Sequence, residues 1–253
     1  MTRVPLPGSL RALRLLSALL LAPLAALHAA DSVESATPAP ATKPTSAGVL
    51  AKYHKVLAAA KEAPPAPGGI ICIGSSHMEF WKSVAEDLAP LTIHNYGIGG
   101  SRMPDAADLF VEHLAIPFKP RAVILYEGSN DLSGGSTPED VLASFRKLHG
   151  KLHAALPDAR LYVLGIVPSP GKRFEKIADI RKTNALLRTE CEAQPWMKFI
   201  DTTTPLIGSD GQPKTECFIP GNIHMLPAGY AVWKSVIAPV VIPAEKPFEF
   251  PRP

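Results

Sequence analysis

The stretch Ile70-Ile71-Cys72-Ile73-Gly74-Ser75-Ser76-His77 decides the fold of this chain. An apolar run without polar interruption is typical of a strand that is buried on both faces of a parallel sheet. Glycine and two serines then end the strand. Because a serine on the turn that leaves a strand points its hydroxyl over the edge of the sheet, Ser76 is a candidate nucleophile. The alternative role for Ser76 is to cap a helix that follows it.

Four further apolar runs have the length of buried strands. They cover residues 91–93, 122–126, 161–167 and 198–200. Helical spacing occurs between them, most clearly from Pro138 to Leu156, where Thr137 is a candidate N-cap and Pro138 suits the first helical position. Helical spacing also covers residues 48–63. Strands that alternate with helices predict an α/β protein in which a five-stranded parallel sheet is covered on both faces, a three-layer α/β/α fold.

Polar motifs follow the first three predicted strands. Gly74 to His77 ends the first strand, Asn95 to Gly100 follows the second, and Gly128-Ser129-Asn130-Asp131 ends the third. In open parallel sheets ligands bind beyond the carboxyl ends of the strands, so these motifs are predicted to meet at one edge. With the imidazole of His224 near the C-terminus, they supply a hydroxyl, amide donors and a base, which acyl transfer requires.

The order of these motifs resembles the SGNH branch of the GDSL esterase and lipase family. The resemblance covers roughly residues 68 to 238 and includes Pro168-Ser169-Pro170 and Ala228-Gly229-Tyr230. It implies a flavodoxin-like sheet, the SGNH hydrolase fold. We interpret the segment around Ser169 as a rigid connection and assign this serine no catalytic role.

The resemblance also implies the role of each candidate residue. Ser76 would be the nucleophile and His224 the general base, since a neutral imidazole near pH 7 can take a proton and return it. The amide of Ser76, the backbone amide of Gly100 and the side-chain amide of Asn130 would form the oxyanion hole. The alternatives are a plain turn at Gly100 and an Asx-turn at Asn130. His77 lies too close to Ser76 along the backbone to act as its base.

One position departs from the family pattern. The usual acid lies three residues before the histidine, where this chain has Gly221. An aspartate there holds the imidazole in one tautomer and stabilises its charge. Glu216 or Asp210 from the same loop, or a backbone carbonyl, is a candidate substitute. The alternative is a weakly active or inactive module of the same fold that binds glycans or lipids.

The composition excludes other classes of function. The net charge is +3, and the lysines and arginines are spread rather than clustered, so nucleic acid is not an expected partner. No Gly-x-Ser-x-Gly motif, phosphate loop or metal-ligand spacing occurs, so neither the larger lipase fold nor a metal or cofactor is expected.

The two ends of the chain differ in composition from the domain between them. Residues 1–30 have the layout of a secretory signal peptide, and residues 31–47 form a Pro-, Ala-, Thr- and Ser-rich linker. We therefore predict a periplasmic or secreted protein without stable membrane insertion after cleavage, a hydrolase domain over 48–243 and a tail over 244–253. In an oxidising compartment Cys191 and Cys217 either pair or stay free.

These observations predict a serine esterase that forms an acyl-enzyme on Ser76. The expected substrate is a small ester with a short acyl chain, carried by an acetylated carbohydrate or a lysophospholipid. The sequence leaves the oligomeric state open.

Overall fold

The computed structural model describes residues 43–249, so the predicted signal peptide, residues 31–42 of the predicted linker and the last four residues lie outside the described part. Within it, five parallel strands form one sheet in the order β2-β1-β3-β4-β5. The strands are β1 (Ile70–Gly74), β2 (Ile93–Gly97), β3 (Ala122–Tyr126), β4 (Arg160–Leu164) and β5 (Met197–Ile200). This order and the parallel pairing confirm the predicted flavodoxin-like α/β sheet.

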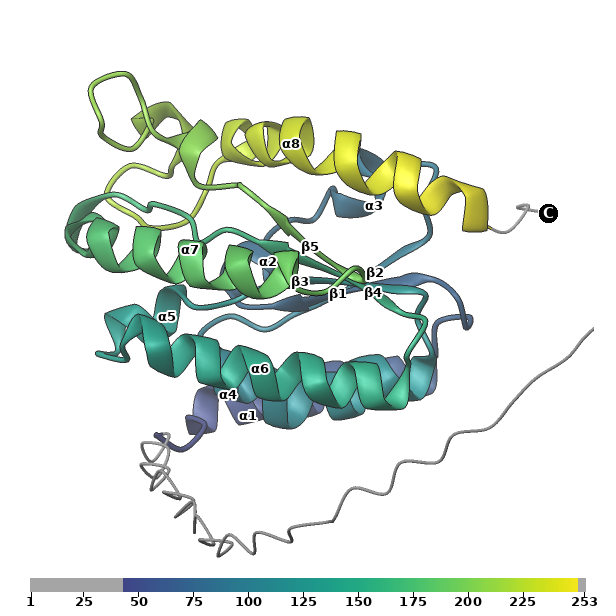
Figure 1. Cartoon of the computed structure of the whole chain (residues 1–253). Helices are drawn as coiled ribbons and strands as arrows, with labels where there is room; N and C mark the ends of the chain where they lie inside the picture. Colours follow the sequence, from purple (N-terminus) through teal and green to yellow (C-terminus); the bar gives the residue numbers. More distant parts are fainter. Residues whose placement is uncertain (1–42, 250–253) are drawn as a thin grey trace, which may run out of the picture. The chain divides into compact units, whose positions relative to one another are not determined.

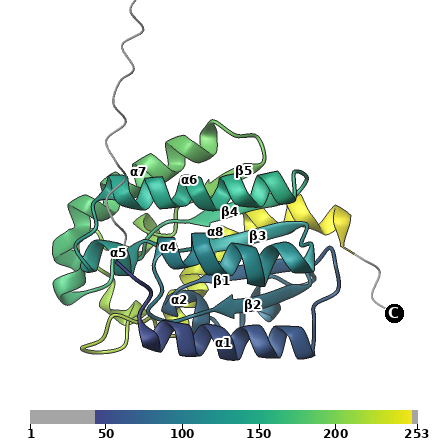
Figure 2. The same ribbon diagram turned by 90° about the horizontal axis from the view of Figure 1, so that it is seen from below.

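Helices cover both faces of the sheet (Figure 1). The α-helices are α1 (Ala47–Glu62), α2 (Ser76–Glu79), α3 (Val84–Asp87), α4 (Met103–Asp105), α5 (Ser129–Ser133), α6 (Pro138–Ala155), α7 (Ile177–Glu192) and α8 (Pro227–Glu245). A π-helix, η1 (Ala106–Ala115), continues α4, and short 3-10 helices are η2 (Ile116–Phe118), η3 (Gly171–Lys176), η4 (Thr204–Leu206), η5 (Thr215–Cys217) and η6 (Lys246–Phe248). Figure 2 shows α1, α6 and α7 on one face, with α8 behind the sheet.

The position of β1 between two apolar cores explains why its sequence carries no polar residue. Ile71 and Ile73 belong to the core beneath α1, α6 and α7, whereas Ile70 and Cys72 belong to the core beneath α8. Successive side chains of a strand point to opposite faces, so a strand covered on both sides needs apolar residues throughout. All four side chains are at most 1% exposed.

The second strand differs from its prediction. The run predicted at 91–93 marks only its start, because the ladder begins where Ile93 pairs with Ile70 and continues to Gly97. As an edge strand, β2 is only half-buried over most of its length, so it lacks a continuous apolar run. The fourth strand ends at Leu164, three residues before its predicted end, where its pairing with Ile200 of β5 stops.

The three cysteines in the described residues are free thiols. Cys191 packs in the core on the α6 and α7 side, and Cys217 packs in the core on the α8 side. The sheet therefore lies between these two residues, and they do not form the disulfide that the sequence left open.

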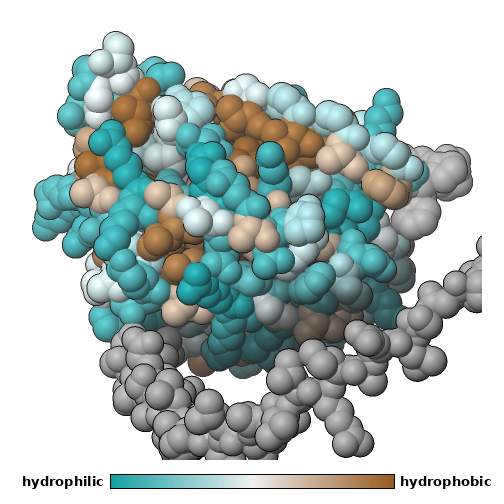
Figure 3. Space-filling model, in the orientation of Figure 1, coloured by the Kyte–Doolittle hydropathy of each residue, from teal (hydrophilic) through white to brown (hydrophobic). Residues whose placement is uncertain are grey.

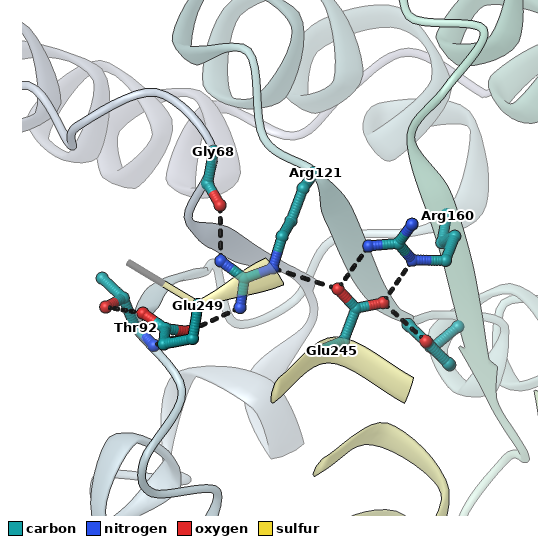
Figure 4. A network of polar contacts seen from close by, with 7 residues as sticks. Gly68, Thr92, Arg121, Arg160, Glu245 and Glu249 are labelled. Atoms are coloured by element: carbon teal, nitrogen blue, oxygen red, sulfur yellow. Dashed lines mark hydrogen bonds and ion pairs between the residues drawn. The ribbon is translucent and has the colours of Figure 1, made fainter. Parts of the chain in front are cut away.

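A buried ion network fastens the end of α8 to the sheet (Figure 4). Glu245 is fully buried and accepts hydrogen bonds from Arg121, Arg160 and Tyr162. Arg121 also donates to Glu249 at 2.6 Å. The segment predicted as a tail thus begins inside α8 and packs, up to Glu249, against the ends at which the strands begin.

The outer surface of α8 is unusually apolar. Figure 3 shows apolar side chains gathered along this helix, where Ala238, Pro239 and Ile242 line a shallow surface hollow. Among residues 43–249, however, no helix combines the length and the apolar character needed to cross a membrane.

Candidate active site

The turn that leaves β1 places Ser76 at the start of α2. Gly74 has φ +148°, and a Cβ atom there would lie 2.2 Å from the carbonyl oxygen of Tyr126, so only glycine allows this close approach to β3. Ser75 occupies the N-cap position without a side-chain cap bond. The hydroxyl of Ser76 is therefore not used for capping, and Ser76 is 8% exposed.

Ser76 and His224 lie in contact although they are 148 positions apart in the sequence. The Oγ atom of Ser76 is 3.0 Å from Nε2 of His224, within hydrogen-bond distance. Burial lowers the pKa of His224, and the positive charges of Arg173 and Lys52 lower it further, while Glu79 acts in the opposite direction. The imidazole is therefore neutral near pH 7, as a group that accepts the serine proton must be.

A tight turn precedes His224. The amide of Asn222 donates to the carbonyl of Ile219 at 2.9 Å, and Gly221 has φ +69°. Proline at the second position and a glycine of positive φ at the third are typical of a type II turn, here built by Pro220 and Gly221. The glycine that occupies the family's acid position thus supplies the left-handed conformation of this turn, which glycine adopts at least cost.

Neither candidate substitute for the acid binds His224. Asp210 accepts from the amide of Gln212 in its own loop, and the side chain of Glu216 makes no hydrogen bond or ion pair with another residue in 43–249. Over the same range, Nδ1 of His224 has no hydrogen-bond partner. The carbonyl candidate that the sequence left open is likewise not found at Nδ1.

Three N–H groups were predicted as oxyanion donors, namely the backbone amides of Ser76 and Gly100 and the side-chain amide of Asn130. The backbone amides of Ser76 and Gly100 donate to no acceptor within the described residues, and Gly100 has φ +91°. The Nδ2 atom of Asn130 donates to the carbonyl of Ser101 at 2.8 Å, which uses one of its two hydrogens. Gly100 follows β2 and Asn130 lies in α5 after β3, so both lie at the carboxyl edge of the sheet, the edge at which Ser76 follows β1.

Arg173 in η3 is a site residue that the sequence did not reveal. Its guanidinium donates to the Ser129 carbonyl at 2.6 Å and to the Asn130 Oδ1 atom at 3.0 Å. The second bond fixes the amide orientation of Asn130, so that Nδ2 faces Ser101. Arg173 follows the segment around Ser169, and no local motif identifies it.

Two carboxyl groups hold the loop that carries Gly100. Glu79, one turn after Ser76, accepts from the amide of Gly99 at 2.6 Å. Glu127, at the end of β3, accepts from the Ser101 hydroxyl at 2.5 Å. Burial raises the pKa of Glu127 well above its usual value, and the neighbouring carboxylate of Asp131 raises it further. Burial therefore favours the neutral form of the Glu127 carboxyl group.

A second contact joins the segments of Ser76 and His224. His77 Nε2 lies 3.1 Å from the carbonyl oxygen of Ile223, and the Ser169 hydroxyl donates to the same oxygen at 2.8 Å. Burial lowers the pKa of His77 to about 3. The neutral ring therefore carries its proton on Nε2 and donates it to Ile223. Among residues 43–249, no group of three His, Cys, Asp or Glu side chains could hold a metal ion.

The fold and the site together define the class. A parallel α/β sheet whose carboxyl edge joins a serine hydroxyl, a neutral imidazole and free N–H donors has the parts of a hydrolase that acts on ester bonds. The chain belongs to the GDSL-like lipase/acylhydrolase family, whose profile matches residues 70–232. It is an ester hydrolase of this family.

One relative and two solved structures show what the chain is similar to. The chain is 27% identical, over 195 residues, to the human platelet-activating factor acetylhydrolase IB subunit alpha1, covering 68% of this chain and 77% of that one. A GDSL-like lipase from Bacteroides thetaiotaomicron superposes with a TM-score of 0.66 at 19% identity, covering 77% of this chain and 99% of that one. A carbohydrate esterase family 3 protein from Talaromyces cellulolyticus gives a TM-score of 0.53 at 18% identity, covering 71% and 99%. At these identities the two structures show a common fold.

Proposed function

We propose that the chain is a serine esterase in which Ser76 is the nucleophile and His224 the general base. The observation that supports this assignment is the 3.0 Å separation between Ser76 Oγ and His224 Nε2. As Oγ attacks the ester carbonyl carbon, its proton passes to Nε2, and the carbonyl oxygen becomes an oxyanion. The free amides of Ser76 and Gly100, with the second hydrogen of Asn130 Nδ2, donate to this oxyanion.

Collapse of the tetrahedral intermediate breaks the bond to the alcohol, which leaves with the proton from Nε2 of His224. Water then attacks the acyl-serine and gives its proton to the same nitrogen, and the acid is released as Ser76 recovers its hydrogen. Because two half-reactions share one base, an activated ester should give a burst of alcohol before steady turnover.

We infer a short acyl chain as the preferred substrate feature. Phe80 is 41% exposed, and its ring meets the His224 ring edge-on at a centroid distance of 4.8 Å, so an exposed aromatic ring borders the base. The names of the relatives support the same choice, since the human protein is an acetylhydrolase and one solved neighbour is an acetyl esterase. The alcohol part of the ester would be a carbohydrate or a lysophospholipid. We also propose that the protein is exported to the periplasm or the medium.

Hydrolysis of p-nitrophenyl esters from acetate to palmitate measures the acyl preference. Activity should fall as the chain lengthens, and a rise with chain length would refute the short-acyl proposal. The same assay on Ser76→Ala should show only the uncatalysed rate. A Ser76→Ala protein with wild-type activity would refute the nucleophile.

The absence of an acceptor at Nδ1 of His224 within residues 43–249 favours one alternative, a non-catalytic module that binds glycans or lipids. A fluorophosphonate probe distinguishes the two proposals, because labelling requires an activated hydroxyl. Labelling of the wild type at Ser76, with none in Ser76→Ala or His224→Ala, supports the esterase. A folded wild-type protein that remains unlabelled supports the binding module.

A further inference from the structure

The backbone around His224 is held by an unusual number of contacts. In the peptide unit that joins Ile223 to His224, the oxygen accepts from His77 and Ser169, and the N–H donates to the side-chain oxygen of Asn222 at 3.1 Å. The following carbonyl, that of His224 itself, accepts from the amide of Ile219 at 2.9 Å. Every polar backbone atom adjoining the imidazole therefore has a partner.

Two contacts lie side by side between the segment of Ser76 and the segment of His224. Ser76 contacts His224, and the next residue, His77, contacts the preceding residue, Ile223. Consecutive residues of one segment thus bind consecutive residues of the other. A pair of contacts one residue apart fixes the rotation between two segments as well as their separation, which a single contact does not.

The partners of Ile223 are themselves rigidly held. His77 is 2% exposed, and its ring packs against Tyr126 and Trp233 at centroid distances of 5.3 and 6.3 Å. The hydroxyl of Tyr230 donates to the carbonyl of His77 at 3.0 Å. Ser169 is fully buried. Both donors therefore approach the carbonyl of Ile223 from fixed positions.

We propose that His77 and Ser169 are positioning residues that hold His224 in its catalytic orientation through the carbonyl of Ile223. This inference rests on the proposed function, in which His224 is the base. The acid of a serine, histidine and acid triad both orients the imidazole and stabilises its charge. The two donors take over the orienting part, because they fix the peptide from which the imidazole extends, and they leave the charge of the imidazolium without a carboxylate partner.

The test replaces the smaller donor, because Ser169→Ala removes one hydroxyl and leaves the aromatic packing of His77 in place. Ser169→Thr keeps the hydroxyl and serves as the conservative rescue. Ser235→Ala is a matched control, since Ser235 also donates to a backbone carbonyl, that of Val232 at 2.7 Å, on the exposed side of α8. Fluorophosphonate titration counts the active sites, so that kcat for p-nitrophenyl acetate is expressed per competent molecule.

Ser169→Ala should lower kcat per titrated site about fivefold, the equivalent of one hydrogen bond, with KM unchanged. The midpoint of the acidic limb of the pH profile should not move, because the lost hydroxyl carries no charge. Ser169→Thr should recover activity to within about twofold of the wild type, and Ser235→Ala should match it. A purely structural role for Ser169 would lower the melting temperature and the titrated fraction while leaving kcat per site intact.

Two results would overturn the proposal. One is a Ser169→Ala protein whose kcat per titrated site equals that of the wild type, and the other is a Ser169→Thr protein as slow as Ser169→Ala. Failure of the esterase proposal would look different, because the wild type itself would then take up no probe.

Discussion

Arg173 offers a direct test of how charge at the site controls the base. Arg173→Met removes the bond to Asn130 Oδ1 at 3.0 Å and removes a positive charge that lowers the pKa of His224. Two separate effects follow. The first acts on the proposed oxyanion hole and lowers kcat at every pH, and the second acts on the proposed base and moves the pH profile.

The size of the first effect follows from the bond that is lost. A hydrogen bond to a charged group contributes about 1.5 to 3 kcal/mol. Asn130 keeps its contact with Ser101, so the loss of Arg173 loosens the donor without deleting it. The lower value, about 1.5 kcal/mol, corresponds to roughly a tenfold fall in kcat. Deletion of the donor by Asn130→Ala should cost more, about a hundredfold or above.

The sign of the second effect is also fixed. Activity requires neutral His224, so kcat/KM falls as pH drops through the pKa of this residue. Without the cation the imidazolium is less disfavoured, so the pKa rises and the limb moves to higher pH. Burial is the largest cause of the lowered pKa and persists in the variant, so the midpoint should stay below the ordinary value of 6.5.

The assay is the rate of p-nitrophenyl acetate hydrolysis from about pH 4 to 8, with Arg173→Lys as the matched variant. Lysine keeps the charge but lacks the planar fork, so its limb should stay near the wild-type position while its plateau falls. A limb in Arg173→Met that stays in place or moves to lower pH would refute this account of the electrostatics.

Three further predictions concern stability. Glu245→Ala leaves the partly buried guanidinium groups of Arg121 and Arg160 short of a partner and should lower the free energy of unfolding in urea by about 3 kcal/mol. An unchanged midpoint would contradict the role of the network. Gly97→Ala places a Cβ atom 2.2 Å from the amide nitrogen of Glu79 and should lower the melting temperature. The control Gly150→Ala meets no atom within 4 Å and should raise helix stability by up to about 1 kcal/mol. Equal melting temperatures of the two variants would argue against the clash at Gly97. Burial lowers the pKa of His77 from 6.5 to about 3, so between these pH values the unfolded chain binds a proton at this residue and the folded chain does not. The free energy of unfolding should therefore fall below pH 6.5 by up to about 1.4 kcal/mol per pH unit. His77→Gln should flatten this slope, and an equally steep slope in the variant would assign the pH dependence to other groups.

The sequence identified the buried strands because their surroundings demand apolar residues at every position. The predicted run 122–126 coincides with β3, which is fully buried. The edge strand β2 was displaced in the prediction, since one side of it meets solvent and polar residues such as Asn95 are tolerated there. The single helix considered after Ser76 is instead two short helices, α2 and α3.

For the site, the sequence identified candidate catalytic residues but not the residues that position them. It named Ser76 and His224, which the structure places in contact while their roles remain proposals. The contact between His77 and Ile223 uses a backbone carbonyl, which no residue type marks. Arg173 acts across the fold from a segment without a motif. The turn at Pro220 and Gly221 did carry a signal, because Pro-Gly is a turn dipeptide, and it explains why the acid position holds a glycine.

The ion network around Glu245 lies where the strands begin, and the proposed catalytic groups lie where the strands end. Arg121 and Arg160 stand at the amino ends of β3 and β4, a full strand length away from the loops that we propose contact substrate. Because the two sets of residues lie at opposite ends of the strands, substitutions in the loops at the carboxyl ends can change substrate preference without weakening the ion network at the amino ends. Laboratory evolution of this scaffold should therefore vary the loops after β2, β3 and β4 at positions other than Gly100, Asn130, Ser169 and Arg173, and leave the residues drawn in Figure 4 untouched.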